Sequence, residues 1–187
     1  MRRIVLHMMV SLDGFFEGPD GDISWHQVDD ELHTYFNKLL ATSSAFLEGR
    51  VSYQLMEGFW PTADQAPSAD GPMAEFAGIW RHMPKVVYSR TLEGVGPSAT
   101  LVRDVVPDEV RALQARPGGD MVVGGAVLGA EFRRHDLIDE YRVFVNPVLV
   151  GQGRRLFGPD DEPTDLRLVE TRTFGNGVVM LRHERVR

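Results

Sequence analysis

The hydrophobic and polar positions of the chain predict strands that alternate with helices. Residues 4–10 form a β-rich hydrophobic run that ends at a Ser-Leu-Asp-Gly turn signal. Further short hydrophobic runs predict strands at 45–47, 85–88, 99–102, 121–123 and 141–145. Helical spacing of large hydrophobic residues predicts helices that begin near residues 29, 50, 73, 107 and 126.

Two early segments carry specific expectations. Residues 15–25 show no helical period and contain a Gly-Pro-Asp-Gly-Asp run, so we expect a mobile loop over the end of the first strand. The helix that begins at Arg50 is expected to bury Tyr53, Leu55 and Met56 before Pro61 stops it.

The end of the chain predicts a β-hairpin. Residues 166–174 and 178–183 flank a Gly-Asn-Gly turn, which is a strong hairpin signal. The order of elements favours one domain over residues 1–187, with a three-layer α/β/α architecture. Its central sheet is expected to be mostly parallel, with the antiparallel hairpin at its C-terminal edge.

Composition narrows the class of protein. A hydrophobic share of 43% and a charged share of 25% are typical of a globular protein. The net charge of −7 argues against a sequence-independent grip on nucleic acid. The absence of cysteine excludes disulfides and thiolate zinc sites, and the six histidines show no metal-site spacing, so we expect no metal. The N-terminal hydrophobic run is too short for a signal peptide or membrane span, so a cytoplasmic location without membrane contact is expected.

Two glycines separate a predicted strand from a predicted helix. A strand that ends at Gly124 and Gly125 and turns at once into a helix exposes backbone N–H groups at the positive end of a helix dipole, where phosphate can be held. The same pair also suits a tight turn without a ligand, and with Gly129 it does not form the G-x-G-x-x-G fingerprint. Both interpretations stay open on these residues alone.

Two other predicted strands end in similar chemistry. Arg50 and Ser52 follow the strand 45–47, and the segment Ser89-Arg90-Thr91 follows the strand 85–88. Because the carboxyl ends of parallel strands lie along one edge of a sheet, the three strand ends are expected to hold a ligand with several phosphates. Taken singly, each residue is better explained as a solvated or turn residue.

Further motifs run in order through nearly the whole chain. They are Ser11-Leu12-Asp13-Gly14, Gly49-Arg50-Val51-Ser52-Tyr53, Lys85-Val86-Val87-Tyr88-Ser89-Arg90-Thr91-Leu92, Val123-Gly124-Gly125, Leu137-Ile138-Asp139-Glu140 and Pro147-Val148-Leu149-Val150-Gly151-Gln152-Gly153. In this order and spacing the chain resembles the dihydrofolate-reductase-like superfamily. More narrowly, it is similar to the stand-alone reductase domains related to the C-terminal domain of the bifunctional riboflavin-biosynthesis deaminase-reductase. The resemblance implies a dihydrofolate-reductase-like fold that binds NADPH.

The resemblance also implies where the cofactor would lie. Arg50 and Ser52 would lie near its phosphates, and the segment Ser89-Arg90-Thr91 near the adenosine 2′-phosphate. The residues implied along the pyrophosphate are Gly124, Gly125, Ala126, Val127 and Leu128.

The loop after Ser11 would cover the nicotinamide, with Asp13, Gly14 and Phe16 closest to it. The residues expected in the substrate pocket are Met9, Phe16 and Trp25.

Asp30 is the candidate catalytic residue. Its position at the start of the first predicted helix resembles that of the substrate-anchoring acid of dihydrofolate reductases. Hydride addition to a C=N bond needs a matching proton, and a carboxyl group beside an apolar ring can have its pKa raised to supply one. The run Asp29-Asp30-Glu31 is equally typical of ordinary acidity at a helix start.

Two features depart from the family pattern. Glu48 stands where the family usually has an apolar residue before Gly-Arg. The segment after the first loop also lacks the Ser/Thr and Arg pattern by which the riboflavin-pathway reductases hold a ribosyl phosphate. The first departure affects the expected local shape of that site, and the second weakens the transfer of that substrate to this chain.

We therefore expect an NADPH-dependent oxidoreductase that transfers hydride to a C=N or carbonyl of a small pterin-, folate- or aminopyrimidine-like heterocycle. It would be of the dihydrofolate reductase or 5-amino-6-(5-phosphoribosylamino)uracil reductase type. One alternative is a non-catalytic nucleotide-binding regulatory protein on the same fold, and a more distant one is a flavodoxin-like flavin binder. The resemblance also implies a homodimer, and we expect the late hairpin with its neighbouring strand to form the contact.

Overall fold

The computed structural model describes residues 1–65, 70–159 and 161–187. Its strands are β1 (Ile4–Ser11), β2 (Phe15–Glu17), β3 (Ala45–Gly49), β4 (Lys85–Tyr88), β5 (Ala99–Val102), β6 (Met121–Gly124), β7 (Glu140–Asn146), β8 (Arg154–Arg155), β9 (Leu166–Thr173) and β10 (Val179–Arg185). Its helices are α1 (Asp30–Leu40), α2 (Arg50–Glu57), α3 (Gly71–His82), α4 (Pro107–Ala115) and α5 (Ala126–Arg134), with short 3-10 helices at Pro19–Gly21 and Trp60–Gln65.

The central sheet is mostly parallel and carries the predicted antiparallel hairpin. Within the described ranges its eight strands follow the order β5-β4-β3-β6-β1-β7-β10-β9. All pairs from β5 to β7 are parallel, whereas β10 runs antiparallel to both β7 and β9. The predicted three-layer α/β/α fold and its hairpin edge are therefore confirmed.

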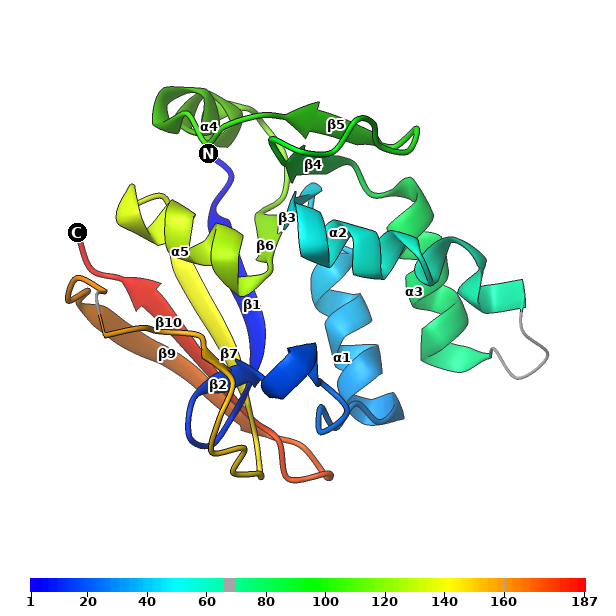
Figure 1. The fold of residues 1–187 in the computed structure, drawn as a ribbon, viewed down its shortest axis with the longest axis vertical. Coiled ribbons are helices and arrows are strands. Elements are labelled where there is room, and N and C mark those ends of the chain that lie inside the picture. The colour runs from blue at the N-terminus through cyan, green and yellow to red at the C-terminus, as the bar shows by residue number, and fades with distance from the viewer. Residues whose placement is uncertain (66–69, 160) are drawn as a thin grey trace.

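Helices cover both faces of the sheet because the strands alternate their side chains between two apolar cores. On one face, residues of α4 and α5 pack against Leu6, Leu47 and Val123. On the other face, residues of α1, α2 and α3 pack against Phe46, Val87 and Val122, all of them buried. Figure 1 shows α5 and α1 on opposite sides of β6 and β1. Adjacent residues of one strand thus face different layers.

Two of the local expectations are wrong. Residues 15–25 begin with strand β2, which pairs with β8, and continue through a 3-10 helix instead of forming only a loop. Leu55 is 60% exposed because α2 turns only one side, marked by buried Tyr53, toward the sheet. The helix also ends at Glu57, and Pro61 lies inside the next 3-10 helix, where a missing N–H is tolerated.

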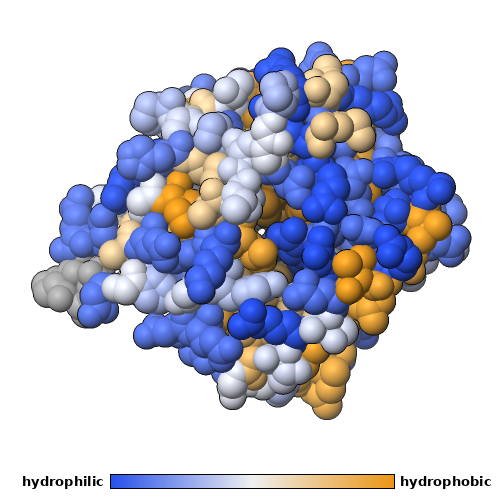
Figure 2. Space-filling model, turned by 180° about the vertical axis from the view of Figure 1, so that it is seen from behind, coloured by the Kyte–Doolittle hydropathy of each residue, from blue (hydrophilic) through white to orange (hydrophobic). Residues whose placement is uncertain are grey.

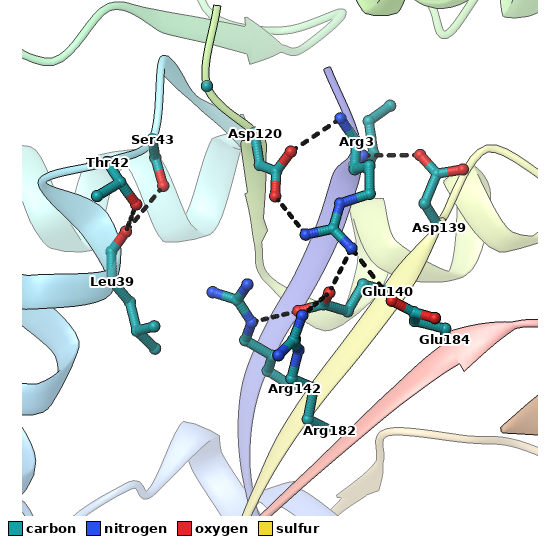
Figure 3. Close-up of polar contacts among 12 residues, drawn as sticks. Arg3, Leu39, Thr42, Ser43, Asp120, Asp139, Glu140, Arg142, Arg182 and Glu184 are labelled. Atoms are coloured by element: carbon teal, nitrogen blue, oxygen red, sulfur yellow. Dashed lines mark hydrogen bonds and ion pairs between the residues drawn. The ribbon is translucent and has the colours of Figure 1, made fainter. Parts of the chain in front are cut away.

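A polar cluster joins β1, β7 and β10 near the N-terminal end of β1 (Figure 3). Glu140 and Glu184 lie opposite each other on β7 and β10, an arrangement that like charges disfavour. The Arg3 Nη1 atom lies 3.0 Å from Glu140 and 3.3 Å from Glu184, so it neutralises both carboxylates. Arg142 and Arg182 also pair with Glu140, which is completely buried.

Among the described residues, none of the helices has the length and apolar character needed to cross a membrane.

Candidate functional site

A cavity of about 1150 Å³ opens at the carboxyl ends of the parallel strands. The last residues of β3, β4 and β6 line it, together with residues from the second half of β1. This is the edge of an open α/β sheet where ligands bind, because helices begin there and their N–H groups face the space. The cavity has a polar part, where α2 and α5 begin, and an aromatic part beside α1 and α3.

The polar part is built from two helix starts that lie against each other. Gly49 precedes α2 and Gly125 precedes α5, and no side chain caps either helix. Gly125 has a φ of 110°, and a Cβ there would collide with the hydroxyl of Ser52. The Gly125 N–H donates only to the Met8 sulfur, at 3.4 Å, which is a weak acceptor. Uncapped N–H groups of two helices therefore face the cavity, an arrangement that suits an anion.

The end of β4 adds hydroxyl and guanidinium groups. The Ser89 Oγ accepts hydrogen bonds from the N–H groups of Thr91 and Leu92, at 3.2 and 3.0 Å, and so shapes the turn. The Arg90 Nε donates to Asp104 at 2.6 Å, and Arg103 donates to the Ser89 carbonyl at 3.1 Å. The sequence analysis missed Arg103 and Asp104, which reach the cavity because β5 pairs with β4.

The aromatic part lies between β1, α1, α3 and the 3-10 helix at Trp60–Gln65. Its rings meet edge to face: Trp60 and Phe76 have centroids 4.4 Å apart, and His7 and Phe36 have centroids 4.8 Å apart. Its other large apolar residues are Met9, Phe46, Met56, Phe59 and Met73. A flat, apolar molecule fits such a lining.

Two polar side chains interrupt this apolar surface, the buried Glu48 and the half-buried His7. Glu48 lines the cavity from the end of β3 and is 4% exposed, and its Oε2 has no hydrogen-bond partner among the described residues. Burial raises the pKa of Glu48 well above its usual value, opposed by the charge of Lys85. His7 lines the cavity from β1, and its Nδ1 likewise has no partner there. Burial, assisted by the charge of Arg142, lowers the pKa of His7 to about 3, so this ring is neutral at pH 7.

Most of the site residues expected from the sequence line this one cavity. They are Met9, Phe16, Arg50, Ser52, Ser89, Arg90, Thr91, Gly124, Gly125, Ala126, Val127 and Leu128. The three strand ends therefore meet at one space, although the ligand that they hold stays a prediction. Phe16 reaches the cavity because β2 pairs with β8, whose Arg154 lies 4.9 Å over its ring and pairs with Glu17.

Four expected residues lie outside the cavity lining. Asp13 accepts hydrogen bonds from the N–H groups of Val150 and Gly151, at 3.1 and 2.8 Å, and so ties two loops together. The Ser11 hydroxyl and these N–H groups lower the pKa of Asp13 to about 2. Gly14, with a φ of 87°, completes this turn.

Trp25 donates its ring N–H to the Asp22 carbonyl and stacks edge-on against His26. Asp30 is exposed at the start of α1, next to Asp29, which caps the helix by accepting the Leu32 N–H at 2.9 Å. Neither Trp25 nor Asp30 lines the cavity. The catalytic role of Asp30 stays a prediction. Four acidic residues do line the cavity, Glu17, Glu48, Asp104 and Glu131, and of these Glu48 is the buried one.

The sequence of the chain matches known proteins over nearly its whole length. Residues 2–180 match the family model described as the RibD C-terminal domain. The uncharacterized protein YyaP of Bacillus subtilis (strain 168) is 34% identical over 181 residues, which cover 96% of this chain and 93% of YyaP. The uncharacterized protein YwjB of the same organism is 28% identical, with 95% of each chain covered.

Solved structures share the fold. A protein from Shewanella sp. PV-4, described as a riboflavin biosynthesis protein, superposes with a TM-score of 0.74 at 23% identity, and all of both chains is covered. A deaminase/5-amino-6-(5-phosphoribosylamino)uracil reductase from Thermotoga maritima superposes with a TM-score of 0.68 at 17% identity. This chain corresponds to 57% of that longer protein.

Proposed function

Because the chain belongs to the RibD C-terminal domain family, we propose that it is an NADPH-dependent reductase that transfers hydride to a C=N or carbonyl of a small, flat nitrogen heterocycle. The observation that carries this proposal is the cavity itself. Two uncapped helix starts and an arginine-bearing turn form one part of it, and an aromatic pocket forms the other. A dinucleotide cofactor needs the anion-binding groups of the first part, and a flat substrate needs the aromatic walls of the second part.

The residues of the polar part fit the phosphates of the cofactor. The N–H groups at the starts of α2 and α5 would hold the pyrophosphate, assisted by Arg50 and the hydroxyl of Ser52. Arg90 and Arg103, beside Ser89, would hold the 2′-phosphate. When bound, the reduced nicotinamide supplies the hydride.

The chain itself would orient the substrate and exclude water. The rings of Phe36, Trp60 and Phe76 give the pocket flat apolar walls, and Phe16 on β2 also lines the cavity. Holding the two reactants in contact within an apolar space lowers the entropic cost of the transfer. The protein thus contributes placement, and the cofactor contributes the difficult chemistry.

Titration with NADPH and with NADH, followed by tryptophan fluorescence, tests the cofactor. We expect NADPH to bind roughly 10- to 100-fold more tightly, because the 2′-phosphate gains charge-assisted hydrogen bonds. Arg90→Ala should remove most of this preference and leave the affinity for NADH unchanged. The matched control is Arg111→Ala, on the exposed side of α4, which should change neither affinity.

Equal affinities of the wild type for NADPH and NADH would be consistent with a reductase but would refute the proposed role of Arg90 in binding the 2′-phosphate. Failure of both nucleotides to bind would reject the proposed function. Binding without consumption of NADPH in the presence of pterins and aminopyrimidines would favour the non-catalytic nucleotide-binding alternative.

A homodimer through the C-terminal hairpin is a further proposal. Strand β9 is exposed along its whole length, and Leu166, Leu168 and Val169 are 39%, 53% and 39% exposed. Hydrophobic residues lie among hydrophilic ones along the side of the molecule where this hairpin lies (Figure 2). An unpaired apolar edge strand is a common site of self-association.

Light scattering should give twice the chain mass of 21.0 kDa, and Leu168→Glu should shift the protein toward one chain mass. Val106→Glu, an exposed position before α4, is the control that should leave the mass unchanged. A wild-type protein of a single chain mass would refute the dimer.

A further inference from the structure

We infer that the Glu48 carboxyl group anchors the substrate, by hydrogen bonds to a lactam or imine edge of a heterocycle without phosphate, and donates the proton that accompanies the hydride. This inference rests on the proposed function and names the substrate class and the acid of the same site.

Glu48 lies where the two parts of the cavity meet. It follows Phe46 on the same face of β3, and Phe46 belongs to the aromatic part. It precedes Gly49, where α2 and the polar part begin. A substrate ring in the aromatic part and a nicotinamide in the polar part would meet at this position.

The neighbouring strand leaves space for the carboxyl group. Glu48 is paired with Gly124 of β6, and a Cβ at Gly124 would lie 2.6 Å from the Glu48 Oε1. Any larger residue at 124 would displace the carboxyl group. The Oε2 has no hydrogen-bond partner within residues 1–65, 70–159 and 161–187, although the side chain is almost fully buried. A buried polar atom without a partner costs free energy unless a ligand supplies the missing hydrogen bond.

The surroundings of Glu48 favour its protonated form. Lys85, on β4, is the charged group that acts on its pKa, but the Lys85 Nζ donates to the carbonyls of Trp80 and Met83 and to Ser98. β6 presents Val122 and Gly124 on this side. The effect of burial is therefore larger than that of the Lys85 charge, and it raises the pKa of Glu48 well above 4.5. The protonated carboxyl group then carries one O–H donor and one C=O acceptor.

The surroundings of the two histidines of the aromatic part, His7 and His33, favour their neutral forms, although the charges of Asp30 and Glu75 oppose this at His33. Burial is the main cause that lowers the pKa values of His7 and of His33. A donor and an acceptor on one carboxyl group match the N–H and C=O of a lactam edge, which carries no charge.

The charges of the cavity exclude a phosphate from the substrate position. Among the described lining residues from β1, α1, α3 and the 3-10 helix at Trp60–Gln65, none is an arginine or a lysine. The lining arginines lie instead at the polar part, at the end of α5 and on β8, where Arg154 is already paired with Glu17. Burying a phosphate among aromatic rings without a cation would be strongly unfavourable.

The chemical step balances with one proton from Glu48. A C–H bond forms as the hydride adds to the carbon of the C=N bond, and the π electrons move to the nitrogen. The Glu48 O–H bond breaks and its proton passes to that nitrogen, which leaves a carboxylate. One proton from solvent restores the acid after the product leaves, so each cycle consumes one NADPH and one proton.

Calorimetric titration with 5,6-diaminouracil and with 5-amino-6-(5-phosphoribosylamino)uracil tests the role of Glu48 in substrate binding. The wild type should bind the phosphate-free compound at least about tenfold more tightly. Glu48→Leu should weaken this binding by about 10- to 100-fold, whereas Glu48→Gln, which keeps a donor and an acceptor, should stay within about threefold. Both variants should bind NADPH as the wild type does, and thermal melting confirms that they fold. Glu109→Gln, exposed on α4, is the matched control.

Oxidation of NADPH with 7,8-dihydropterin, a flat lactam with a reducible C=N bond, tests the proton. Glu48→Gln should lower kcat by about 100-fold or more with little change in KM, because an amide donates no proton. The wild-type rate should fall as pH rises through the raised pKa of Glu48, and the residual rate of Glu48→Gln should not change there. Loss of turnover in Asp30→Asn but not in Glu48→Gln would overturn the proton-donor role, as would a wild type inactive on this compound.

The two proposals fail differently. If the wild type binds NADPH and Glu48→Leu binds 5,6-diaminouracil as tightly as the wild type does, the role of Glu48 is overturned and the reductase proposal stands. Tighter binding of the phosphoribosyl compound would overturn the substrate class. A wild type that binds no NADPH would reject the reductase, even if Glu48 still governs binding of 5,6-diaminouracil.

Discussion

Replacement of Gly125 by valine is expected to weaken NADPH binding by about 100-fold or more, equivalent to about 3 kcal/mol. The backbone of Gly125 has a φ of 110°, which a β-branched residue adopts only with strain. Its side chain would also collide with the hydroxyl of Ser52, because the two helix starts approach closely at this point. Relief of that collision would move the N–H groups of α5 away from the proposed pyrophosphate position.

Fluorescence titration with NADPH measures this effect, and circular dichroism shows whether the variant keeps its fold. Gly78→Ala is the matched control, because Gly78 lies inside α3 and its added Cβ would meet no atom within 4 Å. It should leave binding unchanged and stabilise the helix slightly. Normal NADPH affinity in a folded Gly125→Val protein would show that the cofactor does not lie along α5.

Replacement of Glu140 by alanine is expected to lower the free energy of unfolding by roughly 3 to 5 kcal/mol. Glu140 is fully buried, and Arg3, Arg142 and Arg182 all pair with its carboxylate (Figure 3). Without it, three partly buried cations would repel one another and lose their shared partner. The pairing of β10 with β7 would weaken first, because the cluster links these two strands to β1.

Urea denaturation of the variant and the wild type measures this difference. Glu170→Gln is the control, because Glu170 is exposed and lies 3.4 Å from Arg182. Its loss should cost less than about 1 kcal/mol, as for other exposed ion pairs. A Glu140→Ala protein as stable as the control would mean that the cluster contributes no net stability.

Local patterns account for the parts of the site that were foreseen. The strand-end glycines at 124 and 125 and the turn at 89–91 belong to runs whose periodicity and turn residues can be recognised within a few positions. Once a parallel sheet is expected, its carboxyl ends must lie along one edge. The polar part of the cavity follows from these two facts.

Local sequence patterns could not show which carboxylate, Asp30 or Glu48, lines the cavity. Asp30 and Glu48 are both carboxylates beside a strand or helix end, and their difference lies in burial. Glu48 lies in the middle of the sheet, paired with Val87 of β4 and Gly124 of β6, whereas Asp30 lies at the exposed start of α1. Desolvation of this kind favours the protonated form of a buried carboxyl group.

The sequence by itself determined the strands of the central sheet, the five helices, the hairpin turn and the glycines at the strand ends, because each depends on residues that are neighbours along the chain. The tertiary structure alone decided that β2 pairs with β8, that Asp104 holds Arg90, and that Glu140 is buried among arginines. It also decided that Glu48, and not Asp30, lines the cavity. These features depend on contacts between residues far apart in the chain, and on the removal of water that those contacts cause.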